Sequence, residues 1–320
     1  MLQQNAVVIR TAWAKSYNNI ASDICKVNGW TCRTVRKPNF LYPPEADIYI
    51  GSQYDIAVDM IRVRKAAYIT VEGDFLRDVY WGILRRICRE VRCVVPTEWG
   101  KAVFEAHSVD VADVIPHALP LGIPEPVSEK PMDVVYLNAY YVFPCFPYGK
   151  PCTECERKGW KWWGILSSRF KSSLGFLPCG VDVEVPNAVK YSTDVQSVYK
   201  LLSLGKVYAN LTTHEGFGIN PIMALAVGAK VVAWDIPINK EVLGGIDGVY
   251  LVRTSTVQKC YVDSRYMMAE GVMEFMWGDI EEYASAVETA LKSSSMPDIS
   301  AVKQKYSHKL YLKFNEFIFR

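Results

Sequence analysis

The sequence predicts an α/β protein with two doubly wound, Rossmann-like domains that face a cleft. Short apolar, β-branched runs alternate with longer helical patterns along most of its 320 residues, and this alternation is typical of parallel sheets covered by helices. A proline-rich stretch interrupts the alternation, which then restarts. The length agrees with two domains, because a domain usually has about 100–200 residues.

The region before the proline-rich stretch contains strand patterns and two clear helical patterns. The first helical pattern, residues 16–30, ends at Asn28–Gly29, and such residues commonly terminate helices. The second, residues 74–91, repeats apolar residues at helical spacing and predicts a buried face. The residues of that face are Leu76, Val79, Ile83, Ile87 and Val91. Strands are expected at residues 5–11, 31–37, 46–52, 66–72 and 92–98.

Prolines at positions 120, 124, 126 and 131 mark the boundary between the domains, because clustered prolines are typical of linkers. We expect an N-terminal domain at residues 1–122, a linker at 123–131, a second domain at 132–300 and a terminal helix at 301–320. Strands of the second domain are expected at residues 133–139, 172–180, 187–192, 206–212 and 229–235. Its helices are expected at residues 157–170, 194–205, 219–228 and 279–295.

Composition and charge exclude several classes of protein. The formal net charge is +2, so a nucleic-acid binder that relies on bulk charge is not indicated. The longest apolar runs have about 14 residues and contain a lysine, whereas a membrane-spanning helix needs about 20 apolar residues. The N-terminus lacks the pattern of a signal peptide. We therefore expect a cytoplasmic protein with at most peripheral membrane contact, through the lysine- and aromatic-rich last twenty residues. The oligomeric state is left open.

The nine cysteines are expected mainly as small core residues, because most have apolar neighbours and disulfides are unusual in cytosolic proteins outside hyperthermophiles. Their odd number leaves at least one thiol unpaired within a single chain. Cys145, Cys152 and Cys155 are closely spaced. They could bind zinc with Cys179 as a fourth ligand, form a disulfide or remain free, and the sequence leaves these alternatives open.

The strongest local signal is THEGFGINPIMALAVGAKVVAWD, which begins at Thr213. It reads as a loop, a helix and a strand. Gly216 and Gly218 permit positive φ angles and a close approach of the backbone to a ligand. The helix that follows directs free N–H groups at a potential phosphate. Glu215 lies beside this anion site, where a carboxylate suits the hydroxyls of a sugar attached to the phosphate. A plain loop with a solvated glutamate is an equally good interpretation of these residues alone.

This stretch resembles the C-terminal signature of the retaining GT-B glycosyltransferases of glycosyltransferase family 4. In that family the loop S-x-x-E-G-F-G precedes an apolar helix that ends in glycine and an apolar strand that carries aspartate and proline. The matching positions are Glu215, Gly216, Phe217, Gly218, Gly228, Val231, Val232, Asp235 and Pro237, followed by Glu241 and Val242.

Three further segments agree with the family in order and spacing, so that the resemblance covers roughly residues 92–245. The turn Arg157-Lys158-Gly159 matches the family turn whose lysine contacts the donor diphosphate. Residues 187–192 match the strand whose end meets the nucleotide base, near Tyr191 and Ser192. The segment that closes the N-terminal domain matches at Thr97, Glu98, Pro116 and His117, with Ala118 in place of the usual glycine. The first 90 residues match in architecture only.

The resemblance implies transfer of a sugar from a nucleotide-diphosphate sugar to a carbohydrate, protein or lipid acceptor, with retention of configuration and without a metal or other cofactor. Residues 1–122 would serve the acceptor, residues 132–300 would bind the donor, and residues 301–320 would cross back to the first domain. Glu215 and Lys158 would be the catalytic residues. The donor would also meet Arg157, Gly216, Phe217, Gly218, Ile219, Asn220, Asn138, Tyr191, Ser192 and Met223.

Two departures from the family pattern concern donor binding. The second acid of the family signature, which usually holds the ribose, is replaced by Met223. A basic residue that often precedes the Lys-Gly turn is replaced by Cys152, and Arg157 could substitute for it in part. A catalytically impaired GT-B protein that binds nucleotide or sugar without transfer is therefore the alternative. A sugar phosphorylase or a sugar-phosphate synthase is the alternative among enzymes.

On the acceptor side, Glu72 and Asp74 follow a strand of the first domain and could bind acceptor hydroxyls. Asp74 could equally cap the following helix. The histidines do not form a cluster with metal-ligand spacing and are expected to be structural or solvated; they are His107, His117, His214 and His308.

Overall fold

The structure is a computed structural model that divides into two compact units. It describes the chain except residues 1–6, 12–14, 36–44, 54–55, 57–61, 72, 75, 140–156, 178–187, 191–193, 263–270 and 320. The first unit comprises Met1–Pro120, Asp263–Gly271 and Tyr306–Arg320, and the second comprises Leu121–Val262 and Val272–Lys305. Residues 123–131, the expected linker, contain no helix or strand and are grouped with the second unit, which begins at Leu121.

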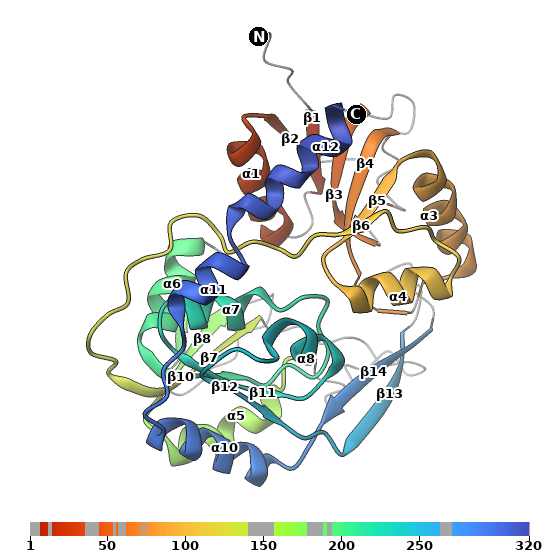
Figure 1. The fold of residues 1–320 in the computed structure, drawn as a ribbon. Coiled ribbons are helices and arrows are strands. Elements are labelled where there is room, and N and C mark those ends of the chain that lie inside the picture. Colours follow the sequence, from red (N-terminus) through yellow and green to blue (C-terminus); the bar gives the residue numbers. More distant parts are fainter. Residues whose placement is uncertain are drawn as a thin grey trace. The chain divides into compact units, whose positions relative to one another are not determined.

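The first unit has a six-stranded parallel sheet with the order β2-β1-β3-β4-β5-β6. Its strands are β1 (Val7–Thr11), β2 (Thr31–Val35), β3 (Glu45–Ser52), β4 (Arg62–Thr70), β5 (Arg92–Val95) and β6 (Asp113–Val114). Its helices include α1 (Lys15–Asn28), α3 (Asp78–Glu90) and α4 (Glu98–Ala106). The parallel α/β architecture predicted from the sequence is confirmed (Figure 1).

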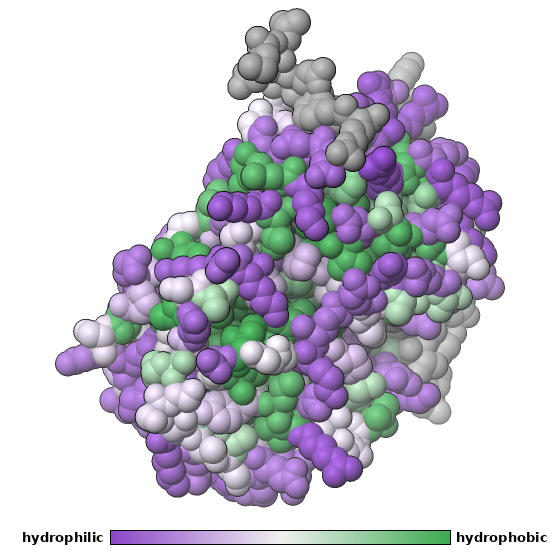
Figure 2. Space-filling model, viewed as in Figure 1, coloured by the Kyte–Doolittle hydropathy of each residue, from purple (hydrophilic) through white to green (hydrophobic). Residues whose placement is uncertain are grey.

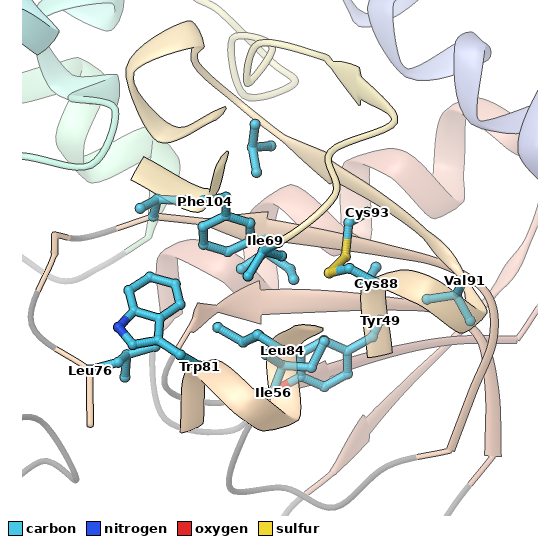
Figure 3. Close-up of a cluster of buried hydrophobic side chains, with 14 of the residues drawn as sticks. Tyr49, Ile56, Ile69, Leu76, Trp81, Leu84, Cys88, Val91, Cys93 and Phe104 are labelled. Atoms are coloured by element: carbon cyan, nitrogen blue, oxygen red, sulfur yellow. A yellow bond between two sulfur atoms is a disulfide. The ribbon is translucent and has the colours of Figure 1, made fainter. Parts of the chain in front are cut away.

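Both faces of this sheet are covered, because alternate strand residues are apolar on either side. Ile48 and Tyr68 pack on one face against α1 and the C-terminal segment. Ile69 and Cys93 pack on the other face, against Trp81 of α3 (Figure 3). A parallel sheet buried on both faces explains why its strands read as continuous apolar runs in the sequence.

The buried face of α3 agrees only in part with the predicted one, because Leu76 and Val91 are buried and Ile87 packs against the core, but Val79 and Ile83 do not. Trp81, Leu84 and Cys88 are its buried residues, whereas Val79 is 62% exposed. The predicted face was based on aliphatic side chains at helical spacing, but α3 turns the indole of Trp81 toward the sheet. A tryptophan removes more apolar surface from water than a valine does, so its position decides the orientation of the helix.

The last twenty residues form three short helical pieces instead of the single helix expected. These are α11 (Ile299–Lys305), a 3-10 helix η2 (His308–Lys313) and α12 (Phe314–Phe319). Backbone groups that a continuous helix would use bind elsewhere. The carbonyl of Tyr306 accepts from the N–H of Leu119, and that of Tyr311 accepts from the side chain of Asn28. Tertiary hydrogen bonds therefore replace helical ones in this segment.

Four cysteines of the first unit are paired in disulfides, Cys25 with Cys32 and Cys88 with Cys93, contrary to the expectation of free core thiols. Each bridge joins the last turns of a helix to the second residue of the strand that follows it, α1 to β2 and α3 to β5. The two bridges therefore fasten equivalent helix-to-strand connections. Cys145, Cys152, Cys155 and Cys179 lie outside the described residues.

We predict that each bridge contributes about 2 kcal/mol to the free energy of unfolding, as loops this short imply in the chain-entropy model. Replacing each pair with serine should lower the unfolding free energy by that amount in urea titrations. Dithiothreitol should destabilise the wild type similarly and leave the variant without these four cysteines almost unchanged. An equal effect of the reductant on that variant would show that other cysteines carry the stabilisation.

The second unit has a six-stranded parallel sheet with the order β12-β11-β10-β7-β8-β9. Its strands are β7 (Met132–Ala139), β8 (Ser172–Leu177), β9 (Ala188–Lys190), β10 (Gly205–Asn210), β11 (Lys230–Trp234) and β12 (Val249–Val252). Its helices include α5 (Trp160–Arg169), α6 (Val195–Ser203), α7 (Ile219–Ala226), α8 (Pro237–Leu243) and α10 (Ile280–Lys292). A separate pair of strands, β13 (Thr256–Val262) and β14 (Gly271–Trp277), was not predicted.

Strands β7 and β10 are neighbours at the centre of this sheet, and the strand order runs outward from them in both directions. This is the switch point of a doubly wound sheet, where the loops after the two central strands diverge and leave room for a ligand. The two segments that follow these strands are therefore where a binding site is expected.

Candidate active site

The two segments at the switch point are joined directly by hydrogen bonds. One is the turn Arg157-Lys158-Gly159 at the start of α5, and the other is the loop from Thr213 to Gly218 between β10 and α7. The backbone N–H of Thr213 donates to the carbonyl of Arg157 at 2.9 Å, and its hydroxyl donates to the same carbonyl at 3.2 Å. The sequence motifs predicted for the donor are thus brought together by the sheet topology.

Glu215 lies between two cations. Its Oε1 accepts from Nη2 of Arg157 at 2.9 Å, and its Oε2 accepts from Nζ of Lys158. All three side chains are largely buried, with exposed fractions of 17% for Glu215, 12% for Arg157 and 19% for Lys158. The two residues predicted as catalytic, Glu215 and Lys158, are therefore in direct contact.

The main chain holds this triad from several sides. Nε of Arg157 donates to the carbonyl of His214 at 2.9 Å, and the hydroxyl of Tyr136 donates to the carbonyl of Lys158. Strand β14 contacts the acidic loop, because Nδ1 of His214 donates to the carbonyl of Glu274 at 3.0 Å. The contributions of Tyr136 and β14 were missed, since no motif in the sequence marks them.

The charges around Glu215 determine its ionisation. Burial raises the pKa of the Glu215 carboxyl, but the positive charges of Lys158 and Arg157, together with hydrogen bonding by Lys158, outweigh burial and lower it to about 2. Glu215 is therefore ionised at neutral pH, and these three side chains together carry one positive charge. The cluster can attract an anion, provided that the anion competes with or displaces the carboxylate.

Two glycines with positive φ shape the site. Gly159 has φ of 69°, and an added Cβ would lie 2.3 Å from the carbonyl oxygen of Leu211, so this turn packs directly on the end of β10. Gly218 has φ of 79° and precedes α7. The first turn of α7 begins at Ile219, four residues after Glu215, so a helix N-terminus lies next in sequence to the carboxylate that contacts the two cations.

The remaining predicted donor residues differ in placement. Gly216 and Phe217 are buried in the loop, whereas Ile219 and Asn220 are partly exposed in the first turn of α7. Met223 is only 3% exposed. Asn138 is the residue before the last in β7. Tyr191 and Ser192 lie outside the described residues.

Glu72 and Asp74 were predicted to serve the acceptor. Glu72 lies outside the described residues, and Asp74 lies within them. Asp74 does not cap α3, because that helix begins four residues later, at Asp78, with Arg77 as its N-cap. Its exposed carboxylate instead pairs with Nε2 of His107. The imidazole of His107 stacks on Trp81 with ring centroids 3.9 Å apart, a partnership that sequence spacing could not indicate.

His117 is fully enclosed in a polar network of the first unit. The hydroxyl of Tyr68 donates to the carbonyl of Ile115 at 2.6 Å, so Nδ1–H of His117 donates to that hydroxyl at 2.8 Å. Its Nε2 then accepts from the hydroxyl of Thr70 at 3.1 Å. Burial lowers the pKa of His117 to about 3, which makes it a neutral structural residue.

This burial predicts an acid dependence of stability. The pKa of an unfolded histidine is about 6.5, so between that pH and about 3 the unfolded chain binds one more proton than the folded one at position 117. The unfolding free energy should therefore fall with falling pH by up to about 1.4 kcal/mol per pH unit in this window, and not above it. His117→Asn should remove this slope in urea titrations at a series of pH values. Parallel curves for both proteins would contradict the prediction.

Among the described residues, no group of histidine, cysteine, aspartate and glutamate side chains is arranged to hold a metal ion. Within the same residues, no helix combines the length and apolar character that crossing a membrane requires.

No family model matches the sequence, and no characterised protein matches it. Sucrose-phosphate synthase from Thermosynechococcus elongatus superposes with a TM-score of 0.60 over 98% of both chains, at 12% identity. The lipopolysaccharide outer core galactosyltransferase WaaB has a TM-score of 0.52 over 98% of this chain and 99% of its own, at 11% identity.

A third similar structure is a variant of TarM from S. aureus in complex with fondaparinux, α-GlcNAc-glycerol and UDP. It has a TM-score of 0.52 over 79% of this chain and 50% of its own, at 12% identity. At such identities the likeness concerns the fold alone. The chain has the GT-B fold of these glycosyltransferases.

Proposed function

We propose that the protein is a glycosyltransferase that moves a sugar from a nucleotide-diphosphate sugar to a carbohydrate, protein or lipid acceptor. The observation that carries this proposal is the buried contact of Glu215 with Lys158 and Arg157 at the switch point of the second sheet. A fold that hosts many functions does not decide the activity, but paired cations beside a carboxylate suit a ligand that joins phosphate to hydroxyls. The GT-B fold agrees with such a donor.

Each part of the site has a task in this mechanism. Lys158, Arg157 and the first N–H groups of α7 stabilise the charge that develops on the departing nucleotide diphosphate, because fixed cations and dipoles act strongly where water is excluded. Glu215 binds hydroxyls of the donor sugar and fixes its orientation. The positive charge comes from the protein, so we propose that transfer needs no metal.

The stereochemistry follows the family that the motifs resemble. We propose retention of configuration, with the acceptor attacking from the face that the diphosphate leaves and the leaving phosphate accepting the acceptor's proton. This mechanism needs no protein nucleophile. Glu215, whose pKa is about 2, is poorly suited to take up a proton near neutral pH.

Met223 stands where the resembling family has the carboxylate that holds the ribose of the nucleotide. Its side chain is buried within α7, and a thioether offers a ribose hydroxyl only a weak acceptor. We propose that the ribose is bound by other groups or less tightly than in enzymes with a carboxylate there. This residue also motivates the second candidate function, a GT-B protein that binds nucleotide or sugar without transfer.

A panel of nucleotides and nucleotide sugars tests the proposal. UDP, GDP, ADP and their hexose derivatives would be added to the full chain, with the unfolding temperature and the release of free nucleotide diphosphate as readouts. A ligand that binds only the folded protein raises its unfolding temperature. We expect one base to stabilise the protein and its sugar derivative to be turned over. Stabilisation without turnover, with all acceptor classes supplied, would favour the binding protein, and no stabilisation by any ligand would contradict both candidates.

A further inference from the structure

The outward face of α3 combines apolar and cationic side chains that folding of the first unit does not use. Val79 is 62% exposed. Ile83, one turn later, is not part of the hydrophobic core beside it. Val79 and Ile83 belong to the apolar row that the sequence indicates, and the structure leaves Val79 exposed and Ile83 partly exposed, whereas Leu76 and Val91 of that row are buried. Arg85, Arg86 and Arg89 lie beside it on the same helix.

None of these three arginines forms an ion pair or a hydrogen bond with any residue that the structure describes. They line a hollow of about 350 Å³ together with Gly82 and Glu90. Residues at positions 82, 85, 86 and 89 follow helical spacing, so the hollow runs along one side of α3. Figure 2 shows mainly hydrophilic side chains over this part of the molecule.

A second hollow of about 570 Å³ adjoins the first, since Arg89 and Glu90 line both. It adds the cations Arg64, Lys65 and Arg92, against one further acid, Asp110. Arg64 is paired with Glu45, and Arg92 lies over the ring of Phe317, 5.3 Å from its centroid. The cations therefore outnumber the acids across the whole surface.

This surface, defined by Val79, Ile83, Arg85, Arg86, Arg89 and Arg92, follows α3, which runs from the C-terminal end of β4 back to the N-terminal end of β5. Arg92 is the first residue of β5, whereas Thr97 and Asp74 follow the opposite ends of these strands. Arg89 and Arg92 therefore lie away from the loops predicted to face an acceptor, whereas Val79 lies in the first turn of α3, nearer to them.

The chemistry of the surface identifies its partner. Guanidinium groups bind phosphate oxygens through paired hydrogen bonds, and the row from Val79 to Arg89 extends about 15 Å along the helix, which is longer than a single phosphate group. The exposed Val79 and the partly exposed Ile83 would gain nothing from a free phosphate, but they can enter the boundary between headgroups and acyl chains. We propose that this face of α3 docks the protein onto a membrane surface that carries anionic phospholipids.

Flotation of the full chain with vesicles tests the proposal. We expect binding to vesicles of phosphatidylcholine with phosphatidylglycerol at low salt, and none to phosphatidylcholine alone. The variant with Arg85→Gln, Arg86→Gln and Arg89→Gln should bind on the order of a hundred-fold more weakly, because each cation near an anionic bilayer contributes roughly a five-fold factor. The matched control replaces Lys171, Lys200 and Lys292, exposed lysines of the second unit, with glutamine and should bind like the wild type.

A second pair of variants separates lipid from other anions. Val79→Asn with Ile83→Asn should weaken vesicle binding several-fold, whereas Val257→Asn, at a 53% exposed valine of β13, should not change it. Circular dichroism would confirm that every variant is folded. The proposal would be overturned if the wild type ignores anionic vesicles, if the triple arginine variant binds as well as the control, or if single-stranded RNA is bound through these arginines while vesicles are not. None of these outcomes bears on donor binding.

Discussion

Replacing Glu215 with glutamine is expected to tighten the binding of inorganic pyrophosphate and, in the same variant, to abolish most sugar transfer. In the wild type the carboxylate of Glu215 contacts both Arg157 and Lys158, so an incoming diphosphate must share these cations with it. Glutamine removes the competing charge while it keeps the size of the side chain. Because opposite charges in contact at a partly buried site interact by a few kcal/mol, we expect pyrophosphate to bind roughly ten-fold more tightly or better.

Transfer should change in the opposite direction. A neutral amide cannot hold the sugar hydroxyls as a carboxylate does, and loss of one such charged contact in an active site commonly costs about 10²–10³ in turnover. Calorimetry with pyrophosphate and turnover of the nucleotide sugar would measure the two effects. Glu274→Gln is the matched control, because Glu274 supplies only its backbone carbonyl to His214 while its side chain pairs with Lys259.

The possible outcomes separate two ideas. If the variant binds pyrophosphate more weakly than the wild type, Glu215 does not compete with the ligand for the cations, although a glycosyltransferase could remain. If neither protein binds pyrophosphate or a nucleotide diphosphate, the proposal that these residues form a donor site is contradicted. The variant leaves two largely buried cations without their acid, which usually destabilises a protein, so binding must be measured well below its unfolding temperature.

The sequence predicts those parts of the molecule whose cause is local. The alternation of strands and helices, the end of α1 at Asn28 and the glycine-flanked acidic loop each depend on a few neighbouring residues. The resemblance placed Lys158 and Glu215 in one donor site, and the structure brings their side chains into contact. The two side chains meet because the strand order makes β7 and β10 neighbours, although these strands are far apart in the sequence.

Features that depend on contacts between residues far apart in the sequence could not be predicted. Either of two faces of α3 could be buried by its apolar spacing, and the position of Trp81 decides between them. The break in the C-terminal helix depends on hydrogen bonds from Asn28 and Leu119 to distant carbonyls. The disulfides could not be predicted, because Cys25 and Cys88 each face the second residue of the next strand only in the folded structure. The spacing of the cysteines alone does not show this.

Replacing Gly159 with alanine is the second change expected to have a large effect, on stability and on the anion site together. The backbone there has φ of 69°, and the new Cβ would lie 2.3 Å from the carbonyl oxygen and 2.7 Å from Cβ of Leu211. Either the turn or the end of β10 must move. Positive φ costs an alanine about 1–2 kcal/mol, and overpacking adds about 1–3 kcal/mol, so we expect a loss of roughly 2–5 kcal/mol in unfolding free energy.

Two matched glycines isolate the cause of that loss. Gly29 also has φ of 69°, but an added Cβ would meet nothing within 4 Å, and at Gly218 the nearest atom would be Cγ of Glu215 at 3.5 Å. Alanine at either position should therefore cost only the conformational term, about 1–2 kcal/mol. The excess loss at Gly159 measures the close packing of the Arg157-Lys158 turn on β10. Because that turn positions both cations, Gly159→Ala should also weaken pyrophosphate binding, whereas Gly29→Ala should leave it unchanged. Equal losses of stability at Gly159 and Gly29, with pyrophosphate affinity intact in both, would show that the position of the cations does not depend on this contact.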